Sequence, residues 1–185
     1  MRIISGILKG KSINFIKNST TRPLKDSVKE NIFNILYHSS LFRINLKESK
    51  VLDLYSGVGS FGIECLSRGV KKVTFVEKDI NAYKILKNNL KQLSLENKAL
   101  VVNEQIKIFL KKTNEKYNIF FLDPPYADNL FIENLNLLKK EKMFENKHLI
   151  IIHREKRSED DFKNCINTLV SKQYGRSKII FGTFN

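Results

Sequence analysis

The chain contains 185 residues, of which 42% are hydrophobic, and it carries a formal net charge of +14 from 33 basic and 19 acidic residues. This length and hydrophobic content predict one domain with its own core and, at most, a small appendage. No apolar run reaches the roughly 18 residues that a membrane-spanning helix needs, and the first residues lack the pattern of a signal peptide. Its two cysteines, Cys65 and Cys165, lie far apart and form no metal-binding or disulfide framework. We expect a cytoplasmic, monomeric protein with no bound metal and no membrane partner.

The basic residues are unevenly distributed along the chain. No acidic residue precedes Asp26, whereas six basic residues do: Arg2, Lys9, Lys11, Lys17, Arg22 and Lys25. A genome rich in Lys, Asn and Ile codons could inflate the basic count, but such bias would not by itself exclude acids from one end. An acid-free basic segment favours a nucleic acid as the partner.

The first elements in chain order form a short basic extension. Residues 2–16 alternate in polarity and contain Gly6 and Gly10, which predicts a β-hairpin broken by glycines. Residues 26–37 then place apolar side chains on one helical face, with Asp26 as the expected N-cap. We predict a small N-terminal hairpin and helix extension over residues 1–45, with a role in RNA docking.

From Val51 onward, short apolar strands alternate with helices. Strands are predicted at 51–55, 72–77, 99–102, 117–122 and 148–153, with helices near 60–68, 80–93, 105–112 and 129–139, and extended segments at 166–172 and 178–184 follow, joined by the turn YGRS. This order predicts an α/β domain over residues 46–185, with a doubly wound, mainly parallel seven-stranded sheet. Ligands of such sheets bind at the carboxyl ends of the strands.

The segment VLDLYSGVGSFG contains Gly57, Gly59 and Gly62 after a predicted strand and before a helix, and Glu77 ends the next strand. This context suits either a dinucleotide or S-adenosylmethionine, because both have ribose hydroxyls that bind such an acid. Asp53, four residues before Gly57, separates the two. It would repel a pyrophosphate but attract the ammonium and sulfonium of S-adenosylmethionine.

Each of these acids also has a purely structural interpretation. Asp53 could cap amides of the loop, and Glu77 could be a solvated strand end. Phe61 and Cys65 fit the buried face of the helix after the loop, so we assign them to the core. The two acids at neighbouring strand ends together favour S-adenosylmethionine as the cofactor.

The segment NIFFLDPPYAD ends an apolar strand on Asp123, Pro124, Pro125 and Tyr126. Methylation of an exocyclic base amine requires acceptors for the amine hydrogens and a surface that holds the base. Asp123 and the Pro124 carbonyl can accept both N–H bonds, the Pro-Pro turn is rigid, and Tyr126 can stack on the base. The alternative is a rigid turn with a buried tyrosine. We predict these four residues as the catalytic set.

Four segments in order, RIISGILKGKSINF, RPLKDSVKENIFNIL, VLDLYSGVGSFGIECLSRGVKKVTFVEKD and FFLDPPY, resemble the RsmD family of bacterial small-subunit (16S) rRNA guanine-N2 methyltransferases. The resemblance implies a Rossmann-like methyltransferase fold and, as substrate, small-subunit ribosomal RNA within an assembling ribosomal particle. It implies cofactor contacts from Asp53, Tyr55, Ser56, Gly57, Gly59, Gly62, Glu77, Lys78, Gln105 and Asp123. The RNA contacts that we expect come from Arg2, Lys9, Lys11, Arg22, Lys25 and Lys29.

The chain departs from the family pattern at Leu24, Ser27 and His153, the last of which replaces a usual glutamate. Either Gln105 or Glu104 could meet the adenine amine.

Three other functions are alternatives. A DNA adenine-N6 methyltransferase shares the glycine loop and a similar DPPY segment, but 185 residues leave little room for its target-recognition domain. A catalytically silent RNA-binding assembly factor would be expected to have lost the glycines or DPPY, and a nicotinamide dehydrogenase is disfavoured by the acid within the first strand.

Overall fold

The computed structural model describes residues 1–15, 24–42, 44–125, 128, 130–162 and 164–185. Its strands are β1 (Lys50–Leu54), β2 (Lys72–Val76), β3 (Ala99–Val102), β4 (Tyr117–Leu122), β5 (Phe144–Glu155), β6 (Ile166–Tyr174) and β7 (Ser177–Phe184). The α-helices are α1 (Asp26–His38), α2 (Ser60–Ser67), α3 (Ile80–Gln92), α4 (Ile106–Lys112) and α5 (Phe131–Lys140), and short 3-10 helices span Leu46–Glu48 and Glu96–Lys98.

The strands form one seven-stranded sheet in the order β3-β2-β1-β4-β5-β7-β6. The first five strands in this order are parallel, whereas β7 runs antiparallel to both β5 and β6. The predicted fold class, a doubly wound and mainly parallel sheet, is confirmed. The chain order reverses between β1 and β4, so the binding crevice of such a sheet is expected above the carboxyl ends of these two strands.

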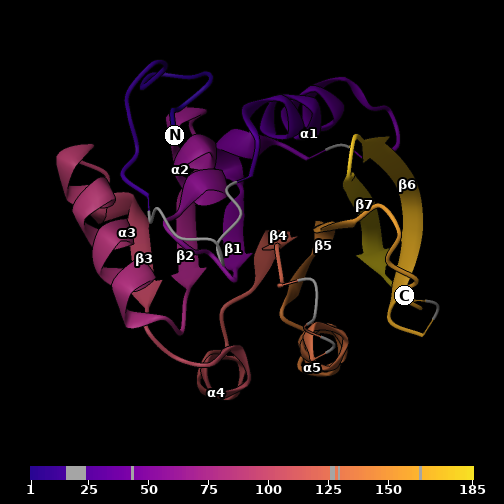
Figure 1. Cartoon of the computed structure of the whole chain (residues 1–185). Helices are drawn as coiled ribbons and strands as arrows, with labels where there is room; N and C mark the ends of the chain where they lie inside the picture. The colour runs from indigo at the N-terminus through magenta and orange to yellow at the C-terminus, as the bar shows by residue number, and fades with distance from the viewer. Residues whose placement is uncertain (16–23, 43, 126–127, 129, 163) are drawn as a thin grey trace.

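The sheet is the middle of three layers. Helices α1, α2 and α3 cover one face, and α4 and α5 cover the other (Figure 1). Each face of the sheet has its own hydrophobic core: the first core lies beneath α1, α2 and α3, and the second beneath α4 and α5. The central strands are buried on both faces, which explains their continuous apolar sequences, since Val51 faces the first core and Leu52 the second. Phe61 and Cys65 are buried in the first core, as predicted.

Two local predictions for the N-terminal region need correction. The predicted hairpin is not a pair of strands: the segment folds back on itself with a single antiparallel bridge between Arg2 and Ser12. Asp26 is not the N-cap of α1, because Lys25 has that position and Asp26 lies in the first turn. Ile3 and Ile13 are buried in the same core as β1. The division of function between residues 1–45 and 46–185 stays a prediction.

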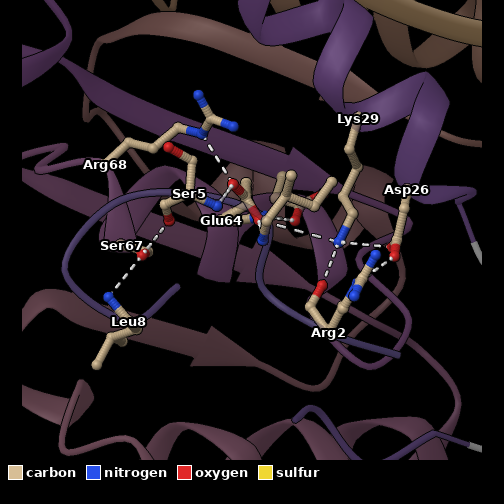
Figure 2. Close-up of polar contacts among 11 residues, drawn as sticks. Arg2, Ser5, Leu8, Asp26, Lys29, Glu64, Ser67 and Arg68 are labelled. Carbon is tan, nitrogen blue, oxygen red and sulfur yellow. Dashed lines mark hydrogen bonds and ion pairs between the residues drawn. The ribbon is translucent and has the colours of Figure 1, made fainter. Parts of the chain in front are cut away.

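A buried carboxylate fastens the N-terminal segment to α2 (Figure 2). Glu64 is fully buried and accepts hydrogen bonds from the backbone N–H groups of Ile4 at 2.8 Å and Ser5 at 3.0 Å. One helical turn later, the hydroxyl of Ser67 donates to the Ser5 carbonyl at 2.6 Å and accepts from the Leu8 N–H at 3.0 Å. The segment is therefore held by specific polar contacts as well as by its buried isoleucines.

The prediction that Lys29 contacts RNA is wrong. Its side chain is fully buried, and its Nζ donates to the Arg2 carbonyl at 2.8 Å and lies 3.9 Å from the Glu64 carboxylate (Figure 2). Burial lowers the pKa of Lys29, and the nearby carboxylates of Glu64 and Asp26 oppose that change. The ammonium neutralises buried acid beneath the N-terminal segment, so it cannot reach a polyanion at the surface.

Candidate active site

A cavity of about 940 Å³ lies at the carboxyl edge of the sheet. It is lined by residues at or just after the carboxyl ends of β1, β2, β3 and β4, by His153 of β5, and by residues of the N-terminal segment and of α3, α4 and α5. The predicted site residues that line it are Asp53, Tyr55, Ser56, Gly57, Glu77, Lys78, Gln105, Asp123, Pro124 and Pro125. The structure thus brings together side chains that are up to 72 positions apart in the sequence, between Asp53 and Pro125.

The glycine loop connects β1 to α2 in a conformation that few other residues adopt. Gly57 and Gly59 have φ angles of +54° and +88°, in the left-handed region. Gly62 serves packing instead, because an added Cβ would lie 2.2 Å from the Phe75 ring. Gly57 lines the cavity, whereas Gly59 and Gly62 are not among the described lining residues. Their roles are in the backbone conformation of the loop and in its packing.

Tyr55, just before this loop, is a non-glycine residue with a positive φ of 60°. Such backbone strain persists only where surrounding contacts hold it, and it is concentrated at functional sites. The Tyr55 hydroxyl accepts a hydrogen bond from the Asn134 side chain of α5 at 2.9 Å. Burial raises the pKa of the Tyr55 phenol, which keeps it neutral. Asn134 was not identified from the sequence, because nothing local links it to the loop.

Glu77 is more than a solvated strand end. Its Oε2 accepts from the Gly57 N–H at 2.7 Å, and its Oε1 accepts from the Asp79 N–H at 2.8 Å. The carboxylate therefore ties the glycine loop to the end of β2 at the cavity wall. Each carboxylate oxygen has a further lone pair that can bind a ligand hydroxyl.

Asp53 has the capping contact that its structural interpretation predicts: its Oδ2 accepts from the Gly62 N–H in the first turn of α2, at 3.0 Å. This contact does not complete its surroundings. The side chain is 1% exposed, and burial raises the pKa of the Asp53 carboxyl well above its usual range. The Gly62 N–H opposes the rise, and the carboxylates of Asp123 and Glu77 add to it.

The cavity thus has three acids, and among the described residues only Asp123 has a basic partner, the ring of His153. Among the described residues, no lysine or arginine forms an ion pair with Asp53, Glu77 or Asp123. The buried hydroxyls of Ser56 and Ser60 also lack a hydrogen-bond partner within the described chain. Unpaired buried groups of this kind are typical of sites that a polar ligand completes. A ligand with positive charge and several hydrogen-bonding groups fits them.

The two candidates for an adenine contact differ in their surroundings. Gln105 is the N-cap residue of α4 and is exposed at the cavity wall. Glu104 also lines the cavity, but its carboxylate forms an ion pair with Lys112 at 2.6 Å. Lys78 lines the cavity as an exposed side chain.

At the end of β4, the Asp123 carboxylate accepts from the ring of His153, with Nδ1 and Oδ1 2.8 Å apart. The Pro125 carbonyl accepts from the guanidinium of Arg154 at 3.3 Å, and Arg154 also pairs with Asp160. Buried side chains of β5 therefore support the Pro-Pro turn, which the sequence did not reveal. Tyr126, the fourth predicted catalytic residue, lies outside the described residues.

The remaining predicted RNA contacts lie at the surface. Lys9, Lys11 and Lys25 are exposed, and Arg2 is exposed while its Nε donates to Asp26 at 3.1 Å. Arg22 lies outside the described residues.

Among the described residues, no helix is long and apolar enough to cross a membrane. In the same part of the chain, no group of three acidic, histidine or cysteine side chains is arranged to hold a metal ion.

The fold and the acid-lined cavity define a Rossmann-like methyltransferase. Two solved structures match nearly the whole chain: yhhF from Escherichia coli, with a TM-score of 0.84 at 28% identity over 100% of this chain and 97% of that one, and HI0767 from Haemophilus influenzae, with 0.78 at 30% over 98% and 96%. A third, SMU.776, is complexed with S-adenosylhomocysteine and matches at 16% identity with a TM-score of 0.63, over 84% of this chain and 49% of that one.

The chain belongs to the family described as "Conserved hypothetical protein 95", whose model matches residues 1–183. The protein named Ribosomal RNA small subunit methyltransferase D from Haemophilus influenzae is 35% identical over 159 residues, which cover 84% of this chain and 79% of that protein. The protein of the same name from Escherichia coli K12 is 32% identical over 155 residues, which cover 84% and 75%. The RsmD-type resemblance found in the sequence is confirmed.

Proposed function

We propose that the protein transfers a methyl group from S-adenosylmethionine to the exocyclic N2 of a guanine in small-subunit ribosomal RNA, within an assembling ribosomal particle. The observation that carries the proposal is that one cavity contains both the acids beside the glycine loop, Asp53 and Glu77, and the Asp123–Pro125 turn. S-adenosylmethionine as the donor agrees with the family membership and with the complex of SMU.776.

The donor half of the site is formed by residues after β1, β2 and β3. When bound, S-adenosylmethionine supplies an electrophilic methyl group on a positively charged sulfur. The Asp53 carboxylate attracts this positive charge in a buried setting where electrostatic interactions are strong. Glu77 accepts from the ribose hydroxyls, and Gln105 accepts from the adenine amine. The ion pair of Glu104 with Lys112 favours Gln105 for the last role.

The acceptor half is the turn after β4. Asp123 and the Pro124 carbonyl accept the two N–H bonds of the guanine amine, which directs the nitrogen lone pair at the methyl group. As the new N–C bond forms and the S–C bond breaks, positive charge develops on the nitrogen and is stabilised by Asp123. The amine proton then leaves to Asp123 or to water. Stacking of the base on Tyr126 stays a prediction.

The exposed basic residues of the N-terminal segment dock the RNA beside the cavity. Met1 and Phe15 line the cavity, so the segment that carries Lys9 and Lys11 begins and ends at its wall. Lysine and arginine contacts to phosphates position an RNA without reading its sequence. This assignment keeps Arg2, Lys9, Lys11 and Lys25 and excludes Lys29, which is buried.

Nucleoside mass mapping tests the proposal. Small-subunit particles from a strain that lacks the gene are incubated with the purified protein and isotope-labelled S-adenosylmethionine, and the RNA is digested. The expected product is one labelled N2-methylguanosine per particle, absent with the Asp123→Ala variant. Label in N6-methyladenine of added DNA, with none in RNA, would contradict the proposal and favour the DNA adenine alternative.

A further inference from the structure

Three side chains from three adjacent strands form a line that ends at the cavity. Asp123 follows β4, and its Oδ1 lies 2.8 Å from Nδ1 of His153 in β5. Nε2 of the same ring lies 2.9 Å from the hydroxyl of Ser177 at the start of β7. His153 and Ser177 are each 4% exposed, so the contact between them is shielded from water, whereas the side chain of Asp123 is 25% exposed. The imidazole ring is held from both sides.

The chemistry of these groups fixes the direction of the hydrogen bonds. An ionised carboxylate only accepts, so Nδ1 of His153 carries the proton and donates to Asp123. If the ring is neutral, Nε2 is an acceptor and the Ser177 hydroxyl donates to it. If the ring is protonated, Nε2 donates and the Ser177 oxygen accepts. A serine hydroxyl does either, so Ser177 keeps the ring oriented toward Asp123 in both protonation states.

Holding one carboxylate oxygen also fixes the other. The Oδ2 atom of Asp123 forms no hydrogen bond with any described residue, and it belongs to a side chain that lines the cavity. Because Oδ1 is bonded to His153, rotation of the carboxylate about its last bond would break that bond. The free oxygen therefore has a defined position before any substrate arrives, which is the preorganisation that positioned acceptors require.

We propose that His153 is a positioning residue for methyl transfer: it fixes the Asp123 carboxylate so that its second oxygen meets the amine of the acceptor base. This proposal deepens, and rests on, the proposed methylation of an exocyclic amine. The ring is not needed to join the strands, because β5 and β7 are already paired by a backbone ladder from Ile150–Gly182 to Glu155–Ser177.

Two amide variants separate the two ends of the ring. In His153→Asn the short amide can donate from near the Nδ1 position, so Asp123 keeps a donor. In His153→Gln the longer amide reaches toward Ser177, and Asp123 loses its donor. Misplacement of a reacting group by about 1 Å costs on the order of a hundredfold in rate. We expect His153→Gln to approach that loss in single-turnover rate and His153→Asn to recover much of it, with unchanged affinity for S-adenosylmethionine and RNA.

The matched control is His148, a partly buried histidine at the other end of β5 whose Nε2 accepts from the Phe184 N–H at 2.9 Å. His148→Gln should lower the melting temperature without changing the rate. A double-variant cycle with Asp123→Ala, which removes the acceptor of the His153 hydrogen bond, completes the test. If His153 acts through the carboxylate, His153→Gln should have little further effect once that carboxylate is absent.

The readout is the number of methyl groups transferred to small-subunit particles, whichever base receives them. A wrong guanine assignment would therefore change the nucleoside found after digestion and leave the ranking of the variants intact. The His153→Asn variant should be well above the His153→Gln variant in rate, and His153→Gln and Asp123→Ala should be strongly non-additive. Equal rates for the two amide variants, or the same loss from His153→Gln with Asp and with Ala at position 123, would overturn the proposal.

Discussion

Two buried acids in this molecule, Glu64 and Asp53, have opposite surroundings. Beneath the N-terminal segment, Glu64 is bonded to two backbone N–H groups and to the Arg68 guanidinium at 2.8 Å, with the Lys29 ammonium 3.9 Å away. At the cavity, Asp53 is equally buried but has one backbone N–H as its partner and two further acids as neighbours.

The difference shows how to separate a structural acid from a binding acid. An ionised carboxylate removed from water is costly unless charges and hydrogen bonds replace its hydration. The protein provides these for Glu64 within its own chain, so that cluster is complete. For Asp53 the described residues provide one backbone N–H and no cation, so the replacement is incomplete, and a cationic ligand can complete it. Burial alone would have classed the two acids together.

The largest expected effect comes from breaking the complete cluster. Replacing Lys29 by Ala leaves buried acid with one cation fewer, which typically costs about 3–5 kcal/mol of unfolding free energy. Urea titration would measure the loss. Lys25→Ala, which removes an exposed lysine four positions earlier, is the matched control and should change stability by no more than about 0.5 kcal/mol. Equal stability of the two variants would mean that Lys29 is not required for the cluster.

Next in size is the loss of the acid at the end of β4. Asp123→Ala should raise the activation free energy of methyl transfer by about 2.7–4 kcal/mol, because one oriented electrostatic acceptor is lost. The rate should fall roughly a hundred- to a thousandfold. Asp123→Asn keeps a carbonyl acceptor without the charge and should retain more activity. Single-turnover assays on unmodified small-subunit particles give both rates. A near-normal rate for Asp123→Ala would show that this carboxylate is structural.

Glu77→Ala should weaken binding of S-adenosylmethionine by about 1.5–3 kcal/mol, the range for a charge-assisted hydrogen bond. Since Glu77 also holds the Gly57 N–H, the loop itself is disturbed, and Glu77→Gln is the useful comparison. The glutamine keeps an acceptor for that N–H, so the affinity of Glu77→Gln for S-adenosylmethionine should lie between those of the wild-type protein and of Glu77→Ala. Calorimetric titration checks the order. Full affinity in the alanine variant would exclude Glu77 from the ribose contact.

The smallest effect is expected at the exposed basic residues. Lys9→Ala and Lys11→Ala each remove one cation that can bind a phosphate, so each should reduce the slope of log affinity against log salt concentration by about 0.7–0.9. RNA binding measured at several salt concentrations gives this slope. Lys29→Met keeps most of the length of the buried side chain and should leave the slope unchanged. A slope that is the same in all three variants would mean that these lysines do not bind phosphates.

The sequence predicted the alternation of strands and helices because each central strand is apolar and each connection has turn or cap residues. It could not predict register. Leu122 pairs with Ile152, and this pairing alone places Asp123 beside His153. Lys29 was misassigned for a similar reason. It stands one helical turn before the buried Phe33, a spacing that indicates the inner face of α1, but its acidic partner Glu64 lies in another helix.

The sign of the Asp53 titration follows from its surroundings. Burial raises the pKa of this carboxyl in the folded protein, so its contribution to stability is present at low pH and is lost as the pH rises through the raised pKa. A cationic ligand next to the carboxylate favours the ionised form and lowers that pKa again. Binding of S-adenosylmethionine must then release protons from Asp53 at pH values between the pKa of the bound and of the free protein.

Proton release on binding therefore tests most directly whether the cavity acids await a cationic ligand. Calorimetric titration of S-adenosylmethionine in buffers of different ionisation enthalpy, repeated from the acid range to neutrality, counts the protons exchanged. The wild-type protein should release protons over part of this range. Asp53→Asn should bind more weakly, release fewer protons and, without its buried acid, unfold at a higher temperature at neutral pH. The same proton count at every pH in both proteins, with equal affinity, would contradict the account.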